Sequence, residues 1–118
     1  MSTVLIAEDA CFIRKRLAKL LTQDNYEVVE AKDGEEAVQA YREVKPDVVL
    51  MDFAMPRKNG MVALNEIRRF DPHAKIIMLT ALGQQAIVLR VMQAGAIDFL
   101  TKPYDPDRIL SVLKKVLG

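Results

Sequence analysis

The sequence has few of the residues that hold small secreted proteins together. It contains one cysteine, Cys11, so no internal disulfide framework can form, and a reducing compartment is expected. We therefore predict a cytoplasmic protein. The only histidine, His73, follows Asp71-Pro72, a turn signal, and we expect a surface residue rather than a phosphotransfer group.

Long hydrophobic runs and an excess of one charge are also missing. The N-terminal apolar run 4–7 is too short for a signal peptide or a membrane span. The 17 Lys+Arg and 16 Asp+Glu residues give a net charge of +1, which does not call for nucleic acid or an acidic membrane as a partner. The 118 residues suit one domain over 1–118, and we expect a monomer.

Short apolar runs alternate with stretches of helical period along the whole chain. Strands are predicted at 4–7, 28–29, 48–51, 76–79 and 97–100. Apolar residues at helical spacing predict helices that include 13–21, 37–44, 61–67, 84–94 and 106–116. Pro46 and Gly95 are expected to end helices, and Asp105-Pro106 to begin the last one. Strict alternation indicates an α/β fold with a parallel sheet covered by helices on both faces.

Polar residues follow four of the five predicted strands. Glu8 and Asp9 follow the first, Asp52 the third, Thr80 the fourth and Lys102 the fifth. In an open parallel sheet, ligands gather beyond the carboxyl ends of the strands. We therefore expect three carboxylates, one hydroxyl and one ammonium to converge at one edge.

This set of groups predicts phosphoryl chemistry assisted by Mg²⁺. Two carboxylates about 4 Å apart repel by roughly 4 kcal/mol at an effective dielectric of 20, so the cluster requires protons or a cation. Mg²⁺ prefers a few carboxylate oxygens, and together with Lys102 it would balance the three negative charges. A carboxylate such as Asp52 can then accept a phosphoryl group, and Thr80 can donate a hydrogen bond to it.

The motifs at these strand ends resemble those of the response-regulator receiver domain of bacterial two-component systems. The likeness covers the whole chain and rests on the following segments: Val-Leu-Ile-Ala-Glu-Asp at 4–9, Val-Val-Leu-Met-Asp at 48–52, Met-Pro at 55–56, Gly60, Leu-Thr-Ala at 79–81 and Phe-Leu-Thr-Lys-Pro at 99–103. The resemblance implies a doubly wound, flavodoxin-like or CheY-like fold of five parallel strands in the order 2-1-3-4-5, with five helices.

The resemblance also implies a role for each matched residue. For the phosphate, it implies Asp52 as the acceptor and Lys102 as the lysine that pairs with it. For the metal, it implies Asp9 and the Ala54 backbone carbonyl as direct Mg²⁺ ligands, with Glu8 acting mainly through water. For the switch, it implies the Thr80 hydroxyl and the Phe99 ring. Ala54 and Leu82 occupy positions that tune acyl-phosphate lifetime in the family, and both are apolar here. Phe99 lacks the hydroxyl that a tyrosine would offer to a partner.

Partners follow from the same resemblance. A sensor histidine kinase or a phosphotransfer protein would supply phosphate, and acetyl phosphate is a second donor in many members. Output would leave through the face of the fourth helix, fifth strand and fifth helix, around Ile87, Leu89, Arg90 and Tyr104. Such a protein is a switch that promotes only its own phosphorylation and dephosphorylation. Its length favours a chemotaxis regulator, whereas a domain cut from a longer regulator and a sporulation-type phosphorelay intermediate are alternatives.

Three other functions fit the sequence less well. A haloacid-dehalogenase-type phosphatase also uses a strand-end aspartate, but it normally has a second aspartate two residues later, where Ala54 stands. A nucleotide-binding module would need a glycine-rich loop after the first strand, and Glu8-Asp9 stands there instead. A pseudo-receiver that only binds proteins would not need Asp9, Asp52, Thr80 and Lys102 together.

Overall fold

The computed structural model describes residues 1–81 and 83–118, and it shows the alternation of strands and helices that the sequence predicts. The strands are β1 (Thr3–Ala7), β2 (Glu27–Ala31), β3 (Val48–Asp52), β4 (Ile76–Thr80) and β5 (Asp98–Thr101). The helices are α1 (Cys11–Gln23), α2 (Gly34–Val44), α3 (Gly60–Phe70), α4 (Gln85–Gln93) and α5 (Pro106–Leu117).

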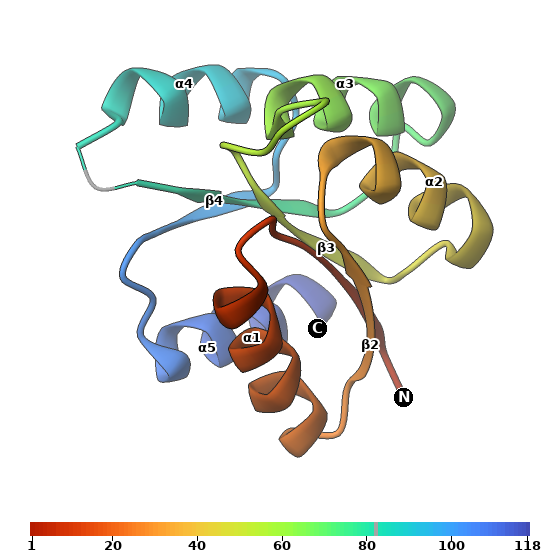
Figure 1. The fold of residues 1–118 in the computed structure, drawn as a ribbon, viewed down its shortest axis with the longest axis vertical. Coiled ribbons are helices and arrows are strands. Elements are labelled where there is room, and N and C mark those ends of the chain that lie inside the picture. Colours follow the sequence, from red (N-terminus) through yellow and green to blue (C-terminus); the bar gives the residue numbers. More distant parts are fainter. Residues whose placement is uncertain (82) are drawn as a thin grey trace.

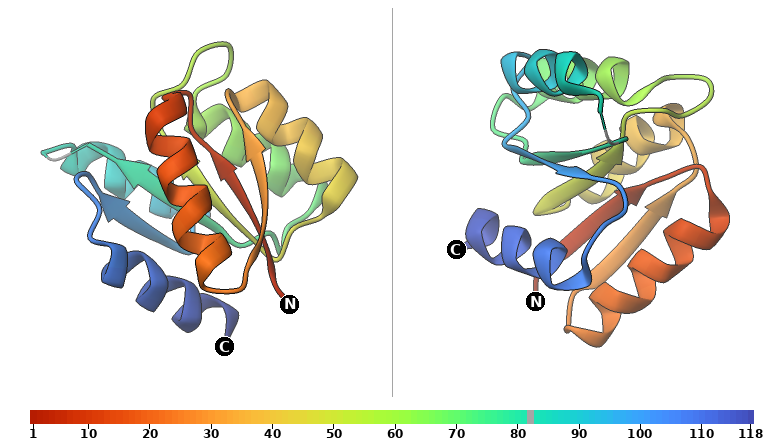
Figure 2. Two further views of the ribbon diagram at one scale, coloured as in Figure 1. Left: turned by 60° about the horizontal axis from the view of Figure 1, so that its bottom comes forward. Right: turned by 90° about the vertical axis from the view of Figure 1, so that its left-hand side faces the viewer.

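The strands form one parallel sheet in the order β2-β1-β3-β4-β5, as the resemblance implied. Helices α2, α3 and α4 cover one face, and α1 and α5 cover the other (Figure 1). Two further views show the same three layers (Figure 2). The predicted fold class is confirmed, and the register places Asp52 beside Leu79 and Thr80 beside Thr101 at one edge of the sheet.

Alternate residues of the strands enter two separate hydrophobic clusters. Leu5, Val49 and Met78 face α2, α3 and α4, whereas Ile6, Leu50 and Leu79 face α1 and α5. All of these side chains are fully buried. Because β1, β3 and β4 are covered on both faces, their sequences are continuous apolar runs rather than alternating ones. The site at their carboxyl ends therefore stands on the most deeply buried strands of the sheet.

Several helix ends follow the local chemistry of the sequence. The side chains of Asp33, Asn59 and Asp105 accept hydrogen bonds from backbone N–H groups in the first turns of α2, α3 and α5. Gly95 follows the end of α4 at a φ of 111°, a left-handed conformation that glycine adopts at low cost. The predicted helix stop at this glycine is confirmed.

The fifth strand begins one residue later than predicted. Ile97 lies outside β5 and its side chain is 44% exposed. It follows the turn through Gly95 and the buried Ala96, at the edge of the sheet formed by β5. His73 is exposed in the turn before β4, as predicted, at the opposite edge from the strand-end acids. No helix in the described ranges has the length and apolar character needed to cross a membrane.

The core predicts a sharp contrast between two leucines. Replacing the fully buried Leu50 by alanine should lower the free energy of unfolding by about 3–5 kcal/mol, because it leaves a cavity in the central strand. Leu89→Ala, at a side chain that is 66% exposed, should change it by less than about 0.5 kcal/mol. Urea unfolding followed by circular dichroism measures both, and similar losses would contradict the assigned layering.

Candidate functional site

The acidic pair after β1 is held in place through its backbone. The Glu8 N–H donates to the Ala31 carbonyl at the end of β2 (3.0 Å), and the Glu8 carbonyl accepts from the Arg14 guanidinium (2.9 Å). Arg14 in turn pairs with Glu30 at 3.0 Å. Glu8 is buried and Asp9 is exposed, so the turn aims one acid inward and leaves the other open to solvent.

Asp52 ends β3 and brings a third carboxylate to the same corner. Its side chain is 4% exposed, and the next residue, Phe53, donates its N–H to the Leu79 carbonyl of β4 at 3.0 Å. Carboxylate oxygens of Glu8, Asp9 and Asp52 all lie within 4.8 Å of one another. The predicted convergence of the acids is therefore present.

Lys102 supplies the positive charge that faces them. Its Nζ lies 3.3 Å from Asp52 Oδ2 and 3.5 Å from Glu8 Oε1. The backbone N–H of Lys102 donates a hydrogen bond to the Thr80 carbonyl at 2.8 Å. Burial lowers the pKa of Lys102, but the attraction of Asp52 and Glu8 outweighs burial and the net shift is upward. The ammonium is therefore charged at every physiological pH.

One ammonium does not balance this corner. Burial first, and then the proximity of the Asp52 carboxyl group, raise the pKa of Glu8 from 4.5 to about 7. Glu8 Oε1 is buried without a hydrogen-bond partner among the described residues, although it lies within ion-pair distance of Lys102. A buried carboxylate oxygen without a hydrogen-bond donor, beside two further carboxylates, belongs to the donor set that a hard divalent cation prefers, so Mg²⁺ fits these residues.

Thr80 and Phe99 lie on the sheet face that α4 covers. The Thr80 hydroxyl is buried and donates a long hydrogen bond, 3.5 Å, to the Leu100 carbonyl. Phe99 is partly buried in the same cluster as Met78, its partner across the β4–β5 pair, and Ile87. The structure thus places Thr80 at the edge with Asp52 and Lys102, and Phe99 two positions back along the sheet.

The segment that connects β3 to α3, residues 53–59, forms the remaining wall and is called the β3–α3 loop below. Ala54 is exposed there, two residues beyond Asp52. Its carbonyl accepts no hydrogen bond from any other described group, which leaves it available to a ligand. Leu82, which was expected to influence acyl-phosphate lifetime, lies outside the described residues.

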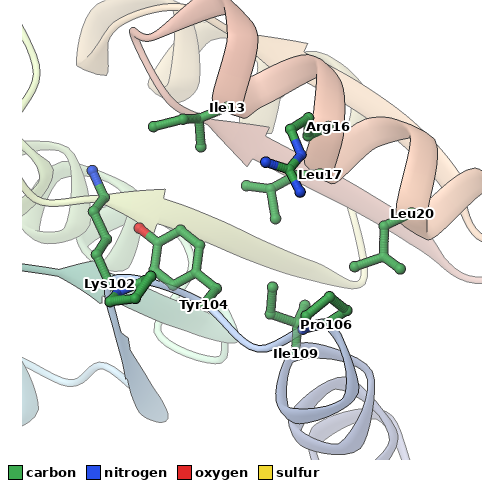
Figure 3. Close-up of a pocket in the computed structure, with 9 residues that line it drawn as sticks. Ile13, Arg16, Leu17, Leu20, Lys102, Tyr104, Pro106 and Ile109 are labelled. Atoms are coloured by element: carbon green, nitrogen blue, oxygen red, sulfur yellow. The ribbon is translucent and has the colours of Figure 1, made fainter.

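Tyr104 is placed differently from the prediction. It was grouped with Ile87, Leu89 and Arg90 on one output surface, but it packs in the cluster beneath α1 and α5, on the other side of the sheet. It lines a groove of about 430 Å³ between these helices, and Figure 3 shows its ring beside Lys102 at one end of that groove. Burial first, and then the charges of Asp52 and Glu8, raise the pKa of Tyr104.

The α4 surface is also only partly as predicted. Ile87 turns inward against the core, whereas Leu89 and Arg90 are exposed. Two residues that support the acidic site and the β3–α3 loop were not predicted from the sequence. Arg14 contacts Glu8 and Glu30, and the buried Asp33 contacts Arg57; these partners are separated from them in the sequence. Asp33 could have been noticed from the sequence, because the pattern Asp33-Gly34 places a typical N-cap residue before a glycine, where a helix-forming residue would be expected.

Comparison with known proteins gives one consistent result. The family model described as the response regulator receiver domain matches residues 4–114. The chain is 50% identical over 114 residues to the chemotaxis protein CheY of Thermotoga maritima, covering 96% of this chain and 95% of that protein. It is 45% identical over 116 residues to CheY of Bacillus subtilis, covering 98% and 97%. A solved response regulator receiver domain protein from Clostridium thermocellum superimposes with a TM-score of 0.94 at 28% identity, covering 99% and 94%.

The buried Glu8 predicts a pH dependence of stability in metal-free buffer. Its pKa is higher in the folded chain than in the unfolded one, so between pH 4.5 and about 7 the folded state holds a proton that the unfolded state has released. Stability should therefore fall as pH rises through this window, by roughly 2–3 kcal/mol. Urea unfolding in EDTA measures the slope. Glu8→Gln should flatten it and the exposed control Glu35→Gln should not; equal slopes in all three proteins would contradict the assignment.

Proposed function

The chain belongs to the response regulator receiver domain family, and we propose that Asp52 is the residue that receives the phosphoryl group. A receiver is a phosphoacceptor switch rather than an enzyme that turns over a separate substrate. One observation carries the assignment to Asp52: its carboxylate lies within 4.8 Å of two further acids and 3.3 Å from the Lys102 ammonium.

The chemistry at Asp52 is a direct displacement. An Asp52 oxygen forms a bond to phosphorus while the bond from phosphorus to the donor's imidazole nitrogen breaks, and the nitrogen keeps the electron pair. Lys102, already beside Asp52, would hold the incoming phosphoryl oxygens by charge, because such transfers depend on placement and charge stabilisation more than on a strong base. Thr80 would donate its hydroxyl hydrogen to a phosphoryl oxygen instead of to Leu100.

The acids define a cation site as well as a nucleophile. Asp9, Asp52 and the Ala54 carbonyl would hold Mg²⁺ directly, and Glu8 would act mainly through water. The ion, when bound, supplies charge neutralisation that lets an anionic phosphodonor approach three carboxylates. Two observations support this assignment: Glu8 Oε1 is buried without a hydrogen-bond donor, and burial beside Asp52 raises the pKa of Glu8, so the carboxylate would gain from a nearby cation.

Thr80 and Phe99 would turn phosphorylation into a change of surface. The long hydrogen bond from Thr80 to Leu100 is weak and easily exchanged for one to a phosphoryl oxygen. Movement of Thr80 toward Asp52 would vacate space on the α4 side of the sheet, where Phe99 is only partly buried. An inward turn of Phe99 would then reshape the surface of α4, β5 and α5, including the exposed Leu89 and Arg90.

The family implies a histidine kinase, or a phosphotransfer protein, as the source of phosphate. The face of α4, β5 and α5 would be the surface for a downstream effector protein. The 45–50% identity to chemotaxis proteins over nearly their full length favours chemotaxis as the process. A phosphorelay intermediate or a longer regulator would share the same chemistry at Asp52.

Phosphorylation of the purified chain tests this proposal. Incubation with acetyl phosphate and Mg²⁺ should add the mass of one phosphoryl group to the wild type, measured on the intact protein. Asp52→Asn should show no such addition, because an amide cannot form the acyl phosphate. Asp24→Asn, a change at an exposed acid after α1, should behave as the wild type; a modified Asp52→Asn protein would place the acceptor elsewhere.

A phosphate mimic tests the switch. Beryllofluoride with Mg²⁺ should shift the ring resonances of Phe99 in NMR spectra, since the ring moves to a more buried environment. Thr80→Ala should abolish that shift without preventing beryllofluoride binding. Phe70, exposed at the far end of α3, provides the internal control, and an unchanged Phe99 in the wild type would defeat the proposed rotation.

A further inference from the structure

We propose that Asp33 and Gly34, where α2 begins, are positioning residues that hold the β3–α3 loop so that the Ala54 carbonyl can reach the metal. The inference rests on the proposed function, since it takes Ala54 as a ligand. Neither residue lies in the site itself. The observations that carry it concern the contact between the beginning of α2 and the far half of the loop.

Gly34 lies directly against the backbone of the loop. A Cβ added at this position would overlap the carbonyl oxygen of Lys58 and lie 2.7 Å from its carbonyl carbon, whereas real Cβ atoms keep at least 3.0 Å. The atoms in the way are the Lys58 carbonyl group and the Lys58 Cβ, which is fixed to the backbone, so rotation of a side chain could not relieve the overlap. Glycine is otherwise a poor choice in the first turn of a helix, and close approach of the loop explains its presence.

The loop is tightly folded where Gly34 touches it. Lys58 donates its N–H to the Pro56 carbonyl at 2.8 Å, and Arg57 between them has a φ of 68°. This is a γ-turn of the rare, strained type. Such a conformation persists only when surrounding contacts enforce it, and strain of this kind is concentrated where a backbone group must be aimed.

Asp33 provides one of the enforcing contacts. Its side chain is almost completely buried and serves two groups at once: Oδ1 accepts from the Glu36 N–H at 2.8 Å, and Oδ2 lies 3.5 Å from Arg57 Nε. Lys58 is tied to α3 through Glu66 at 2.8 Å. Because Arg57 is mainly exposed, its ion pair contributes less than the packing of Gly34.

The other end of the loop is fixed independently. Gly60 donates its N–H to the Phe53 carbonyl at 2.7 Å, and the Phe53 N–H donates a hydrogen bond to the Leu79 carbonyl of β4. Ala54 lies between the anchored Phe53 and the Lys58 backbone that packs against Gly34, and it has no hydrogen bond of its own to another described group. Its carbonyl position is therefore set by the anchors, and displacement of Lys58 by a side chain at position 34 would move it.

Direct binding of Mg²⁺ to the unphosphorylated chain tests the inference. Isothermal titration with Mg²⁺ alone should show affinity about tenfold lower or worse for Gly34→Ala than for the wild type, since residues that orient metal ligands typically have effects of this size. Asp33→Asn keeps the helix cap but loses the charge that faces Arg57, and it should weaken binding by about two- to threefold. The ¹³C shift of the Ala54 carbonyl on adding Mg²⁺ should shrink in both variants.

Two variants act as matched controls. Asp105→Asn makes the same change at the N-cap of α5, and Glu35→Ala alters the exposed neighbour of Gly34; both should bind Mg²⁺ as the wild type does. If Gly34→Ala does not fold, Asp33→Asn decides. If the folded variants bind Mg²⁺ with wild-type affinity and show the same Mg²⁺-induced change at the Ala54 carbonyl as the wild type, the positioning role is overturned and the proposed function is not. A wild type that ignores Mg²⁺ would instead overturn the proposed function.

Discussion

The mutual repulsion of Glu8, Asp9 and Asp52 is the constraint around which the rest of this molecule is arranged. Two of these acids are buried, and their carboxylate oxygens share a space less than 5 Å across. Isolated in an apolar interior, such a group would be protonated or expelled. Lys102 offsets part of the charge, and the upward pKa shift of Glu8 records what remains. The site therefore favours a bound cation, in agreement with the Mg²⁺ site proposed above.

The sheet keeps this unfavourable arrangement in place. β1 and β3 are adjacent, and all their residues except Thr3 are buried, so their ends cannot separate without disturbing both hydrophobic clusters. The backbone around Glu8 is fixed by Arg14 and by β2, and the backbone after Asp52 is fixed by β4. Folding energy from the core thus holds charges together that would separate in an open chain. The switch proposed above would act at the margin of the sheet, where Phe99 and much of α4 are only partly buried.

Two sides of the sheet contact the site through different residues. Thr80 and Phe99 face α4, while Tyr104 and the stem of Lys102 face the groove between α1 and α5. Ile87 and Tyr104 pack on opposite faces of the sheet, so they do not form one continuous surface. On α4, Leu89 and Arg90 are exposed, and they belong to the α4, β5 and α5 face proposed above for an effector. The loop after Asp52 forms a third boundary, anchored by α2 rather than by the sheet.

Local chemistry along the chain determined most of the fold and most of the site residues. Buried parallel strands require unbroken apolar runs, helices require apolar residues at helical spacing, and strand ends in such a sheet meet at one edge, so Glu8, Asp9, Asp52, Thr80 and Lys102 could be grouped before any coordinates. Tertiary structure alone decided the burial of Glu8, the side of the sheet on which Tyr104 packs, the outward turn of Ile97 and the contact of Gly34 with Lys58. Each of these depends on atoms brought together from distant parts of the chain, and periodicity in a sequence carries no information about such distances.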